Sequence, residues 1–95
     1  MSLTFEWDPK KAESNREKHG VSFEEAATAF GDTLSVTISD SGHSEGERRF
    51  LPTGMTAAQR LVVVAHIERG DNIRIVNARP ATRKETRDYE QGATE

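Results

Sequence analysis

The chain has 95 residues, a formal net charge of -3 and no cysteine. This length indicates one domain, spanning 1–95 with frayed ends at 1–4 and 91–95, and the lack of cysteine excludes disulfides and thiolate metal sites. No run of about eighteen apolar residues and no signal peptide is apparent, so we expect no membrane span and a cytoplasmic location. With only 34% hydrophobic residues, a partner or oligomer is expected to contribute stability.

The charge is divided unevenly along the chain. Residues 1–47 contain ten acidic and four basic residues, whereas residues 48–95 contain six acidic and nine basic ones. The negative total argues against generic nucleic-acid binding, but a basic half can still bind phosphate.

A first helix is predicted after Asp8, which can cap it, with Pro9 at its first position and Gly20 just past its end. Apart from Ala12 this helix is nearly all polar, so we expect it to pack weakly on the core.

A second helix is predicted to begin with a capping box formed by Ser22 and Glu25. Its apolar residues recur at the spacing of one helical face and are Phe23, Ala26, Ala27 and Phe30. This helix is therefore expected to pack firmly on a sheet.

Three strands are predicted next, separated by turn-forming residues. Residues 34–38 alternate between apolar and polar side chains, and residues 40–47 form a polar loop that contains His43. Residues 48–53 form a strand that Pro52 places at an edge or a bulge, and residues 61–69 form the most apolar strand, which should be central.

A hairpin with the three-residue loop 70–72 should follow, and it predicts a register in which paired residue numbers sum to 142. Glu68 then faces Arg74, and His66 faces Val76. The opposite face of the two strands is uniformly apolar and should receive the helices. The His66 face is mixed and should be open or covered by a partner.

The last strand should end near Arg79, before Pro80, and a capping box of Thr82 and Glu85 should open a final helix. The expected fold is therefore α+β, with a small antiparallel sheet, two N-terminal helices and one C-terminal helix.

His66, Glu68 and Arg74 form the best candidate constellation for chemistry. RNA self-cleavage needs a base, an acid and a cation, which imidazole, carboxylate and guanidinium can supply. The same three residues could instead be a cross-strand ion pair beside an ordinary surface histidine. The basic residues of 74–87 could likewise be a solvated surface or an anchor for an acidic partner, and Tyr89 could either stack on a base or pack on the sheet.

Several segments resemble the BrnT family of toxins across roughly residues 5–90. They are FEWDPKKAESNREKHGVSFEEAATAF, D-x-x-H-S-E-x-E, R-F-x-x-x-G-x-T, RLVVVAHIERGDNIRIVNARPAT and E-x-R-x-Y. The resemblance implies a ribonuclease toxin with a RelE-like fold and a cognate antitoxin with a ribbon-helix-helix part that binds DNA. The complex would repress its own operon.

The resemblance supports an endoribonuclease that needs neither metal nor cofactor. We assign Arg74 and Arg79 to phosphate, Glu68 or His66 to proton transfer, and the RNA-binding role to Arg69, Lys18, Arg60 and Tyr89. The alternative is a non-catalytic module that tunes a DNA-binding repressor. Direct DNA binding by this chain ranks third, because no recognition helix is apparent.

Four small apolar residues share the His66 face in the predicted register: Val62, Val64, Val76 and Ala78. We expect the antitoxin to dock over or beside them and to offer acidic groups to Arg74 or Arg79. The other possibility is that a helix of the chain itself, such as the one after Thr82, covers this face.

Overall fold

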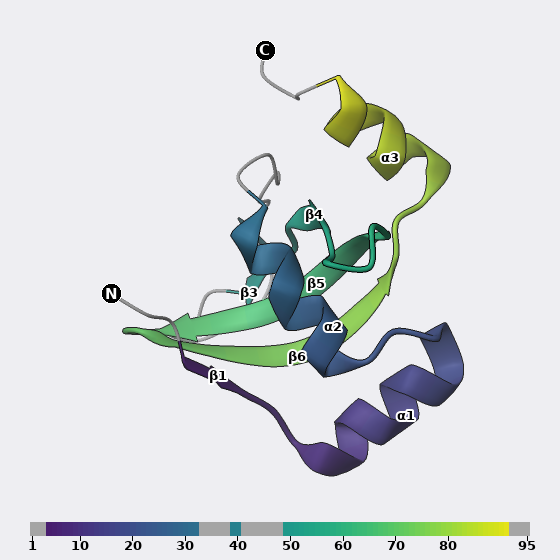
Figure 1. The fold of residues 1–95 in the computed structure, drawn as a ribbon. Helices are drawn as coiled ribbons and strands as arrows, with labels where there is room; N and C mark the ends of the chain where they lie inside the picture. Colours follow the sequence, from purple (N-terminus) through teal and green to yellow (C-terminus); the bar gives the residue numbers. More distant parts are fainter. Residues whose placement is uncertain (1–3, 33–38, 41–48, 92–95) are drawn as a thin grey trace.

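The computed structural model describes residues 4–32, 39–40 and 49–91. A single sheet is accompanied by two helices from the N-terminal part of the chain and one from its C-terminal part (Figure 1). The elements are β1 (Thr4–Glu6), α1 (Pro9–His19), α2 (Phe23–Thr28), the 3-10 turn η1 (Ala29–Gly31), β2 (Ser39–Asp40), β3 (Arg49–Phe50), β4 (Thr53–Met55), β5 (Leu61–Arg69), β6 (Asn72–Pro80) and α3 (Arg83–Glu90). The predicted α+β class is confirmed.

Some predictions fall outside this part of the chain. These are the strand over 34–38, most of the loop over 40–47 with His43, and most of the ends expected to fray, although Thr4 begins β1. Within the described ranges, no helix is long and apolar enough to cross a bilayer.

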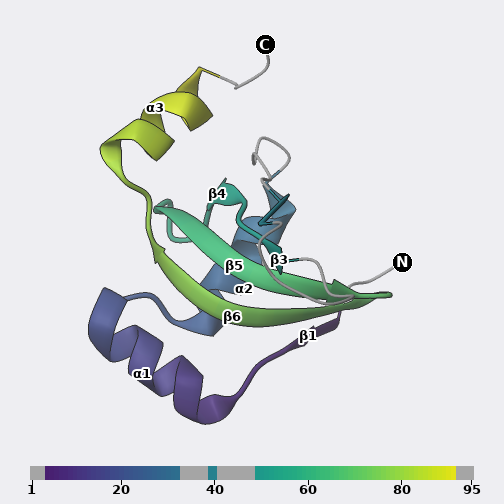
Figure 2. The same ribbon diagram turned by 180° about the vertical axis from the view of Figure 1, so that it is seen from behind.

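The described strands form one sheet in the order β1-β6-β5-β3-β2, with β4 also paired to β5. β5 is the middle strand of this order, as its apolar sequence predicts, and Figure 2 shows it beside β6. The sheet is antiparallel except that β1 runs parallel to β6, which makes it mixed rather than wholly antiparallel. Because β1 runs parallel to β6, the chain leaves β1 in the direction of the far end of β6. There α1 is anchored by the hydrogen bond from Asn15 to the Ala78 carbonyl.

The caps of the first helix form as the sequence predicts. The Asp8 side chain accepts from the Lys10 backbone N–H at 2.9 Å. Pro9 occupies the first turn, and Gly20 ends the helix with a φ of 73°, a left-handed conformation that favours glycine.

The second helix has half of its predicted capping box. Ser22 Oγ accepts from the Glu25 backbone N–H at 3.0 Å, as expected. The Glu25 carboxylate does not return to the helix start but binds Arg60 instead. Arg60, which is distant in the chain, therefore binds the Glu25 carboxylate that the capping box was expected to direct to the backbone N–H of Ser22.

The loop between β5 and β6 is shorter than predicted. Arg69 pairs with Asn72, so only Gly70 and Asp71 connect the strands. Gly70 has a φ of 61°, as the first central residue of a type II′ turn requires. Paired residue numbers near this turn therefore sum to 141, and the predicted pairing of Glu68 with Arg74 is wrong.

A β-bulge in β6 restores the predicted register farther from the turn. Ala65 pairs with Asn77, but His66 pairs with Ile75, so Val76 is the extra residue. Because side chains alternate between faces, one extra residue exchanges the faces of everything on one side of it. Ile73 and Ile75 consequently lie on the same face as Ala78.

The two faces of the β5–β6 ribbon follow from this register. The first, which we call the helix face, carries Val62, Val64, His66, Glu68, Ile73, Ile75 and Ala78. The second, which we call the far face, carries Val63, Ala65, Ile67, Arg69, Arg74, Asn77 and Arg79. Arg49 of β3 pairs with Ile67 and so shares the far face.

The core lies between α2 and the helix face, which corrects the predicted assignment of faces. Phe23 and Ala26 of α2 are fully buried against this face, and Val64 is 1% exposed. The register predicted from the sequence placed the helices on the opposite face, because a three-residue loop would have put Ile73 and Ile75 on the face of Ile67 and Ala65 rather than on the His66 face. The apolar residues proposed as an antitoxin surface are therefore core at Val62, Val64 and Ala78, and they are covered by helices near the N-terminus rather than by α3.

Pro52 interrupts the strand predicted over 48–53. It separates β3 from β4, although its carbonyl still accepts from the Val64 backbone N–H at 3.1 Å. This matches the bulge or edge predicted from a residue that has no N–H to donate.

Candidate functional site

His66 and Glu68 project from the helix face of β5 and contact each other. His66 Nε2 lies 3.2 Å from Glu68 Oε2, and His66 Nδ1 lies 3.2 Å from the Val64 carbonyl oxygen. The His66 side chain is 2% exposed, whereas that of Glu68 is 48% exposed. A buried imidazole therefore holds a carboxylate that solvent can reach.

Two aromatic rings fix the plane of the imidazole. Phe50 stacks on His66 with ring centroids 5.4 Å apart and an interplanar angle of 17°. Phe30 meets the same ring edge-on at 4.8 Å. Such packing restricts the ring, so the direction of its hydrogen bond to Glu68 is preorganised.

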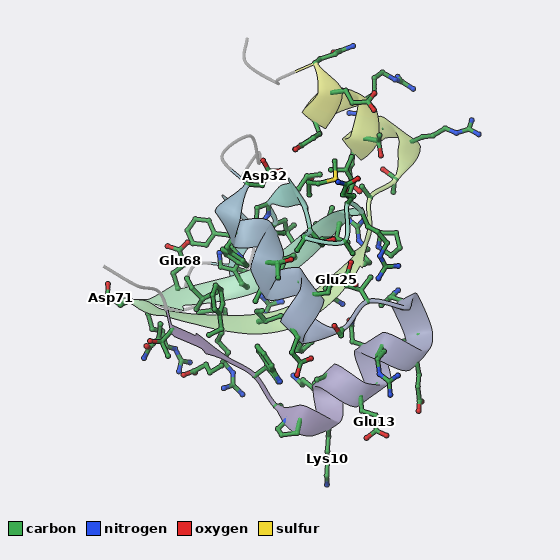
Figure 3. The ribbon with its side chains drawn as sticks, in the orientation of Figure 1. Lys10, Glu13, Glu25, Asp32, Glu68 and Asp71 are labelled. Carbon is green, nitrogen blue, oxygen red and sulfur yellow. The ribbon has the colours of Figure 1, made fainter. Side chains whose placement is uncertain are left out.

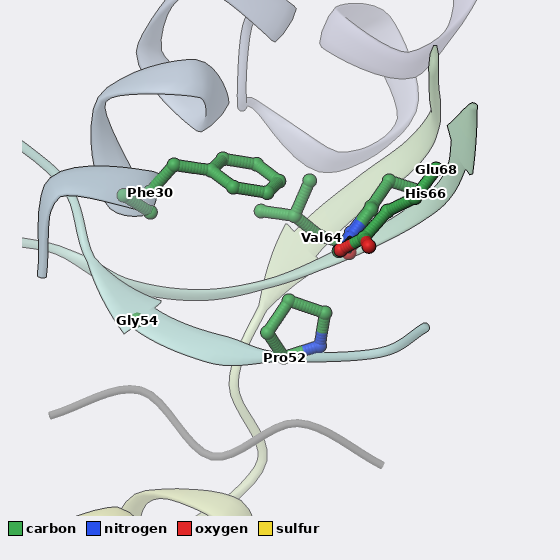
Figure 4. A pocket seen from close by; sticks show the side chains of 7 residues that line it. Phe30, Pro52, Gly54, Val64, His66 and Glu68 are labelled. Carbon is green, nitrogen blue, oxygen red and sulfur yellow. Dashed lines mark hydrogen bonds and ion pairs between the residues drawn. The ribbon is translucent and has the colours of Figure 1, made fainter. Parts of the chain in front are cut away.

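Phe30, His66 and Glu68 line a pocket of about 110 Å³. Figure 4 shows Phe30 and Pro52 on opposite sides of the pocket and His66 beside Glu68. The remaining lining residues are Ala29, Gly54 and Val64, so Glu68 is the acidic group of an otherwise largely apolar lining.

Both partners of His66 are hydrogen-bond acceptors. A neutral imidazole has one N–H, so it can donate to only one of them, whereas the imidazolium can donate to both. The other way to satisfy both contacts is a proton on the Glu68 carboxyl. Both contacts are therefore hydrogen bonds only when the two side chains share one proton in addition to the imidazole N–H.

Arg74 does not join this pair. Its register partner is Ile67, which places it on the far face, and its Nη1 contacts Glu6 Oε2 at 3.3 Å. The predicted constellation of His66, Glu68 and Arg74 is thus split between the two faces of the sheet, because the two-residue turn shifts the register by one.

The far face instead gathers arginines around Ile67. Arg74 and Arg49 flank Ile67 on the two neighbouring strands, and Arg69 follows it by two residues on β5. Across this row, Glu6 pairs with Arg74 in the parallel register of β1.

Arg79 also lies on the far face but is bound to α3. Its two terminal nitrogens donate to the two carboxylate oxygens of Glu85 at 2.8 and 2.9 Å. This contact, with smaller help from the Thr82 backbone, lowers the pKa of Glu85 to about 2, and it raises the pKa of Arg79. In this structure Arg79 links β6 to α3.

Arg60 has a similar structural role. It donates to Glu25 through Nε and Nη2 at 2.9 and 2.6 Å, and Nη2 also donates to the Gly20 carbonyl at 2.8 Å. Its hydrogen bond holds the pKa of Glu25 below the ordinary value.

Tyr89 is partly buried and links α3 to Asp32 at the end of η1. Its hydroxyl donates to Asp32 Oδ2 at 2.5 Å, and the same oxygen accepts from the Met55 backbone N–H at 2.8 Å. The bond to Asp32, with burial second, raises the pKa of Tyr89 to about 12.

Lys18 lies away from all these groups, in a groove between α1 and β6. Of the eight residues singled out from the sequence, the structure brings together His66 with Glu68 near the helices, and Arg69 with Arg74 on the far face. Arg79, Arg60, Tyr89 and Lys18 each have separate surroundings.

Sequence analysis missed three residues that shape these sites: Phe30, Phe50 and Asn15. Phe30 was recognised only as part of an apolar helical face, and Phe50 has no local signal for its contact with His66. Asn15 lies near the middle of a helix, where asparagine is unfavourable. This position is the signal that could have indicated a specific partner for its side chain.

The fold and this pocket define a small α+β domain with an anchored, exposed carboxylate on its sheet. Within the described ranges, no three His, Asp or Glu side chains are grouped so that they could hold a metal ion.

Comparison with known proteins identifies the family. The sequence model of the family described as "Ribonuclease toxin, BrnT, of type II toxin-antitoxin system" matches residues 7–85, and the chain belongs to this family. Membership implies RNA as the target and an antitoxin as a partner. No curated protein matches the chain.

A solved structure supports the same fold. The crystal structure of the Brucella abortus ribonuclease toxin BrnT superposes with a TM-score of 0.64, covering 86% of this chain and 100% of that chain. The two sequences are 16% identical, so this likeness concerns the fold alone.

Proposed function

We propose that this chain is an endoribonuclease toxin that cleaves RNA without a metal ion. In the reaction, a 2′-oxygen attacks the adjacent phosphorus and the bond to the 5′-oxygen breaks, leaving a 2′,3′-cyclic phosphate and a 5′-hydroxyl. A base takes the proton of the 2′-hydroxyl, and an acid gives one to the leaving oxygen. The observation that carries the proposal is the exposed Glu68 carboxylate held by a buried histidine.

Glu68 is the member of the pair that touches RNA. Its side chain is half exposed, whereas His66 is enclosed by Phe30 and Phe50. His66 therefore acts through Glu68, which it orients and supplies with a proton. This assigns proton transfer to the carboxylate and positioning to the imidazole.

The arginines of the far face meet the charge of the RNA backbone. Near the turn of the β5–β6 hairpin, Glu68 lies on one face of β5 and Arg69 on the other, with Arg74 on the neighbouring strand. An RNA strand that crosses this end of the hairpin meets all three side chains. Guanidinium groups bind phosphate oxygens in pairs and compensate their charge without a metal.

Cleavage by the purified chain tests this proposal. Labelled RNA incubated in EDTA should be cut internally, and the fragments should carry 2′,3′-cyclic phosphate and 5′-hydroxyl ends. Cleavage that stops in EDTA would contradict the metal-free mechanism. A chain that cuts no RNA, with the antitoxin verified absent, would support the alternative of a non-catalytic module.

Substitutions test the roles of the residues. Glu68→Gln should reduce cleavage at least a hundredfold, since a general acid or base typically contributes that much. Arg74→Ala should likewise abolish the growth arrest caused by expression of the lone chain. Glu13→Gln, on the exposed side of α1, is the matched control. Circular dichroism must show the native fold in each case, and a fully active Glu68→Gln or Arg74→Ala chain would refute its assignment.

His66→Gln separates positioning from proton transfer. Because the glutamine amide can still donate to Glu68 but cannot take up a proton, cleavage should fall less than in Glu68→Gln, and its pH profile should shift.

The antitoxin of this proposal is a ribbon-helix-helix protein, and DNA is bound only through it. The net charge of -3 on this chain gives the lone toxin little attraction for DNA. Co-expression with the product of the neighbouring reading frame should restore growth and yield a stable complex. Operator DNA should bind that complex and not the lone chain.

A further inference from the structure

A groove between α1 and β6 has a lining suited to anions. Its walls are formed by Lys11, Ser14, Asn15, Lys18 and His19 of α1 and by Val76 and Asn77 of β6. None of these described lining residues is acidic, although the whole chain has 16 acidic residues. Its volume of about 160 Å³ is roughly ten times what one water molecule requires.

The groove is held rigid by Asn15. The Asn15 side chain donates to the Ala78 and Val21 carbonyls at 2.8 and 3.0 Å, and it accepts from the Ala78 backbone N–H at 3.1 Å. These bonds fix α1 against β6, so the positions of the lysines along the groove are set before any ligand arrives.

The lysines of the groove are not explained by stabilisation of the helix. Lys18 lies in the last turn of α1, where a positive charge offsets the helix dipole. Lys11 lies near the start of α1, where a positive charge is unfavourable, and the first turn contains no acidic residue. Lys11 therefore gains nothing from the helix dipole, and the capping Asp8 lies three residues before it along the chain.

The acidic residues of α1 point elsewhere. Glu13 and Glu17 are two positions from Asn15 on either side, which places them about 160° around the helix from it. Figure 3 shows Glu13 and Lys10 directed away from the sheet. One side of α1 is thus mixed and solvated, and the side along the groove is positive.

The groove borders the arginines of the far face. Asn77 pairs with Ala65 and so lies on the same face as Arg74, three residues away along β6. At ~3.3 Å per residue, the two side chains are separated by roughly 10 Å, which a short single strand can bridge. Lys11 and Lys18 are two helical turns apart, also about 10 Å, so together they can serve one or two phosphates.

We propose that the groove between α1 and β6 binds backbone phosphates of the RNA substrate beside the cleavage site. This rests on the proposed ribonuclease function and adds a second contact region to it. Lys11 and Lys18 supply the charge, while Ser14 and Asn77 supply neutral hydrogen-bond donors. The RNA strand then runs from the far face, over Asn77, onto α1.

The test measures binding of a labelled 2′-O-methyl oligoribonucleotide, which has no free 2′-hydroxyl and cannot be cut. The double variant Lys11→Gln/Lys18→Gln should bind about tenfold more weakly at low salt. The slope of log affinity against log salt should fall by up to ~1.4, or ~0.7 for each lost phosphate contact. Lys10→Gln, on the same helix but outside the groove, should behave like the unmodified chain.

Cleavage of ordinary RNA gives a second measurement. The double variant should raise KM and leave kcat within about twofold, because the groove holds RNA away from the reacting atoms. If the double variant binds and cleaves like Lys10→Gln, or if the unmodified chain does not bind the oligonucleotide, the groove proposal is wrong.

Two further outcomes separate this proposal from others. If the double variant loses antitoxin affinity but keeps full RNA binding, the groove serves an acidic protein partner and the RNA proposal is overturned. If the unmodified chain binds RNA through the groove but cuts none, the groove proposal stands and the ribonuclease function fails.

Discussion

One amide side chain takes the place of a neighbouring strand at the edge of β6. β1 pairs with β6 only at Asn72, Ile73 and Arg74. Farther along, Asn15 both accepts from and donates to the backbone of Ala78, as a paired strand would. The side chain is 6% exposed, so these backbone groups have no easy access to water as a substitute.

Asn15→Ala should therefore destabilise the fold far more than the loss of so few side-chain atoms would suggest. It leaves buried backbone groups without partners, which we expect to cost about 2–4 kcal/mol of unfolding free energy in urea. Ser14→Ala, at the next and exposed position, should change it by less than about 0.5 kcal/mol. Equal stabilities of the two variants would show that water replaces the amide.

The last helix depends on polar contacts rather than on burial. α3 has eight residues, none of them buried, and so short a helix is marginal in isolation. Its start is held by the Thr82–Glu85 capping box and the Arg79–Glu85 pair, and its end by the bond from Tyr89 to Asp32. Figure 1 shows α3 set apart from α1 and α2.

Glu85→Gln should weaken the attachment of α3 in a pH-dependent way. The pKa of Glu85 falls from an ordinary 4.5 to about 2 on folding. Its stabilisation is therefore full above pH 4.5 and is lost as the pH falls toward 2. Glutamine can keep the capping box, so the variant isolates the charge. We expect a loss of about 1 kcal/mol at pH 7, since solvent screens a pair whose side chains are about one-third exposed.

Chemical unfolding at several pH values checks this expectation. The difference between Glu85→Gln and the unmodified chain should shrink steadily below pH 4.5. A difference that stays constant down to pH 2 would mean that the charge of Glu85 contributes nothing.

At the scale of the whole molecule, the bulge at Val76 decides which face of the sheet is buried. If Val76 took part in strict alternation instead of bulging, Ile73 and Ile75 would share a face with Arg79 rather than with Ala78. The isoleucines that pack under α2 would then leave the core, and Arg74 would enter it.

Deletion of Val76 should leave both faces as they are, because Ile73, Ile75 and Ala78 then lie on one face by strict alternation. The deletion variant should therefore still fold. Val76→Ala should fold with a loss of about 1 kcal/mol or less, since Val76 is only partly buried. Thermal unfolding followed by circular dichroism measures the stability of both variants. A deletion variant without a native melting transition would show that the extra residue has a further role in the fold.

Local features were determined by the sequence itself. The caps at Asp8, Gly20 and Thr82 follow from nearest neighbours along the chain, and each forms as predicted. The α+β class follows from the change of hydrophobic period between helices and strands. The family was identified from short segments in a fixed order and is confirmed by the match over residues 7–85.

The faces of the sheet and the makeup of the site were decided only in the tertiary structure. One residue fewer in the turn at Gly70 separates Arg74 from His66 and Glu68, which the sequence had placed together, and the extra residue at Val76 keeps Ala78 on the face of Ile73 and Ile75. Alternation along a strand gives the relative faces of neighbouring residues, but it cannot show where a bulge reverses them. Likewise, the partners of His66 and Asn15 are distant in the chain, at Phe30, Phe50 and Ala78, and only folding brings them into contact.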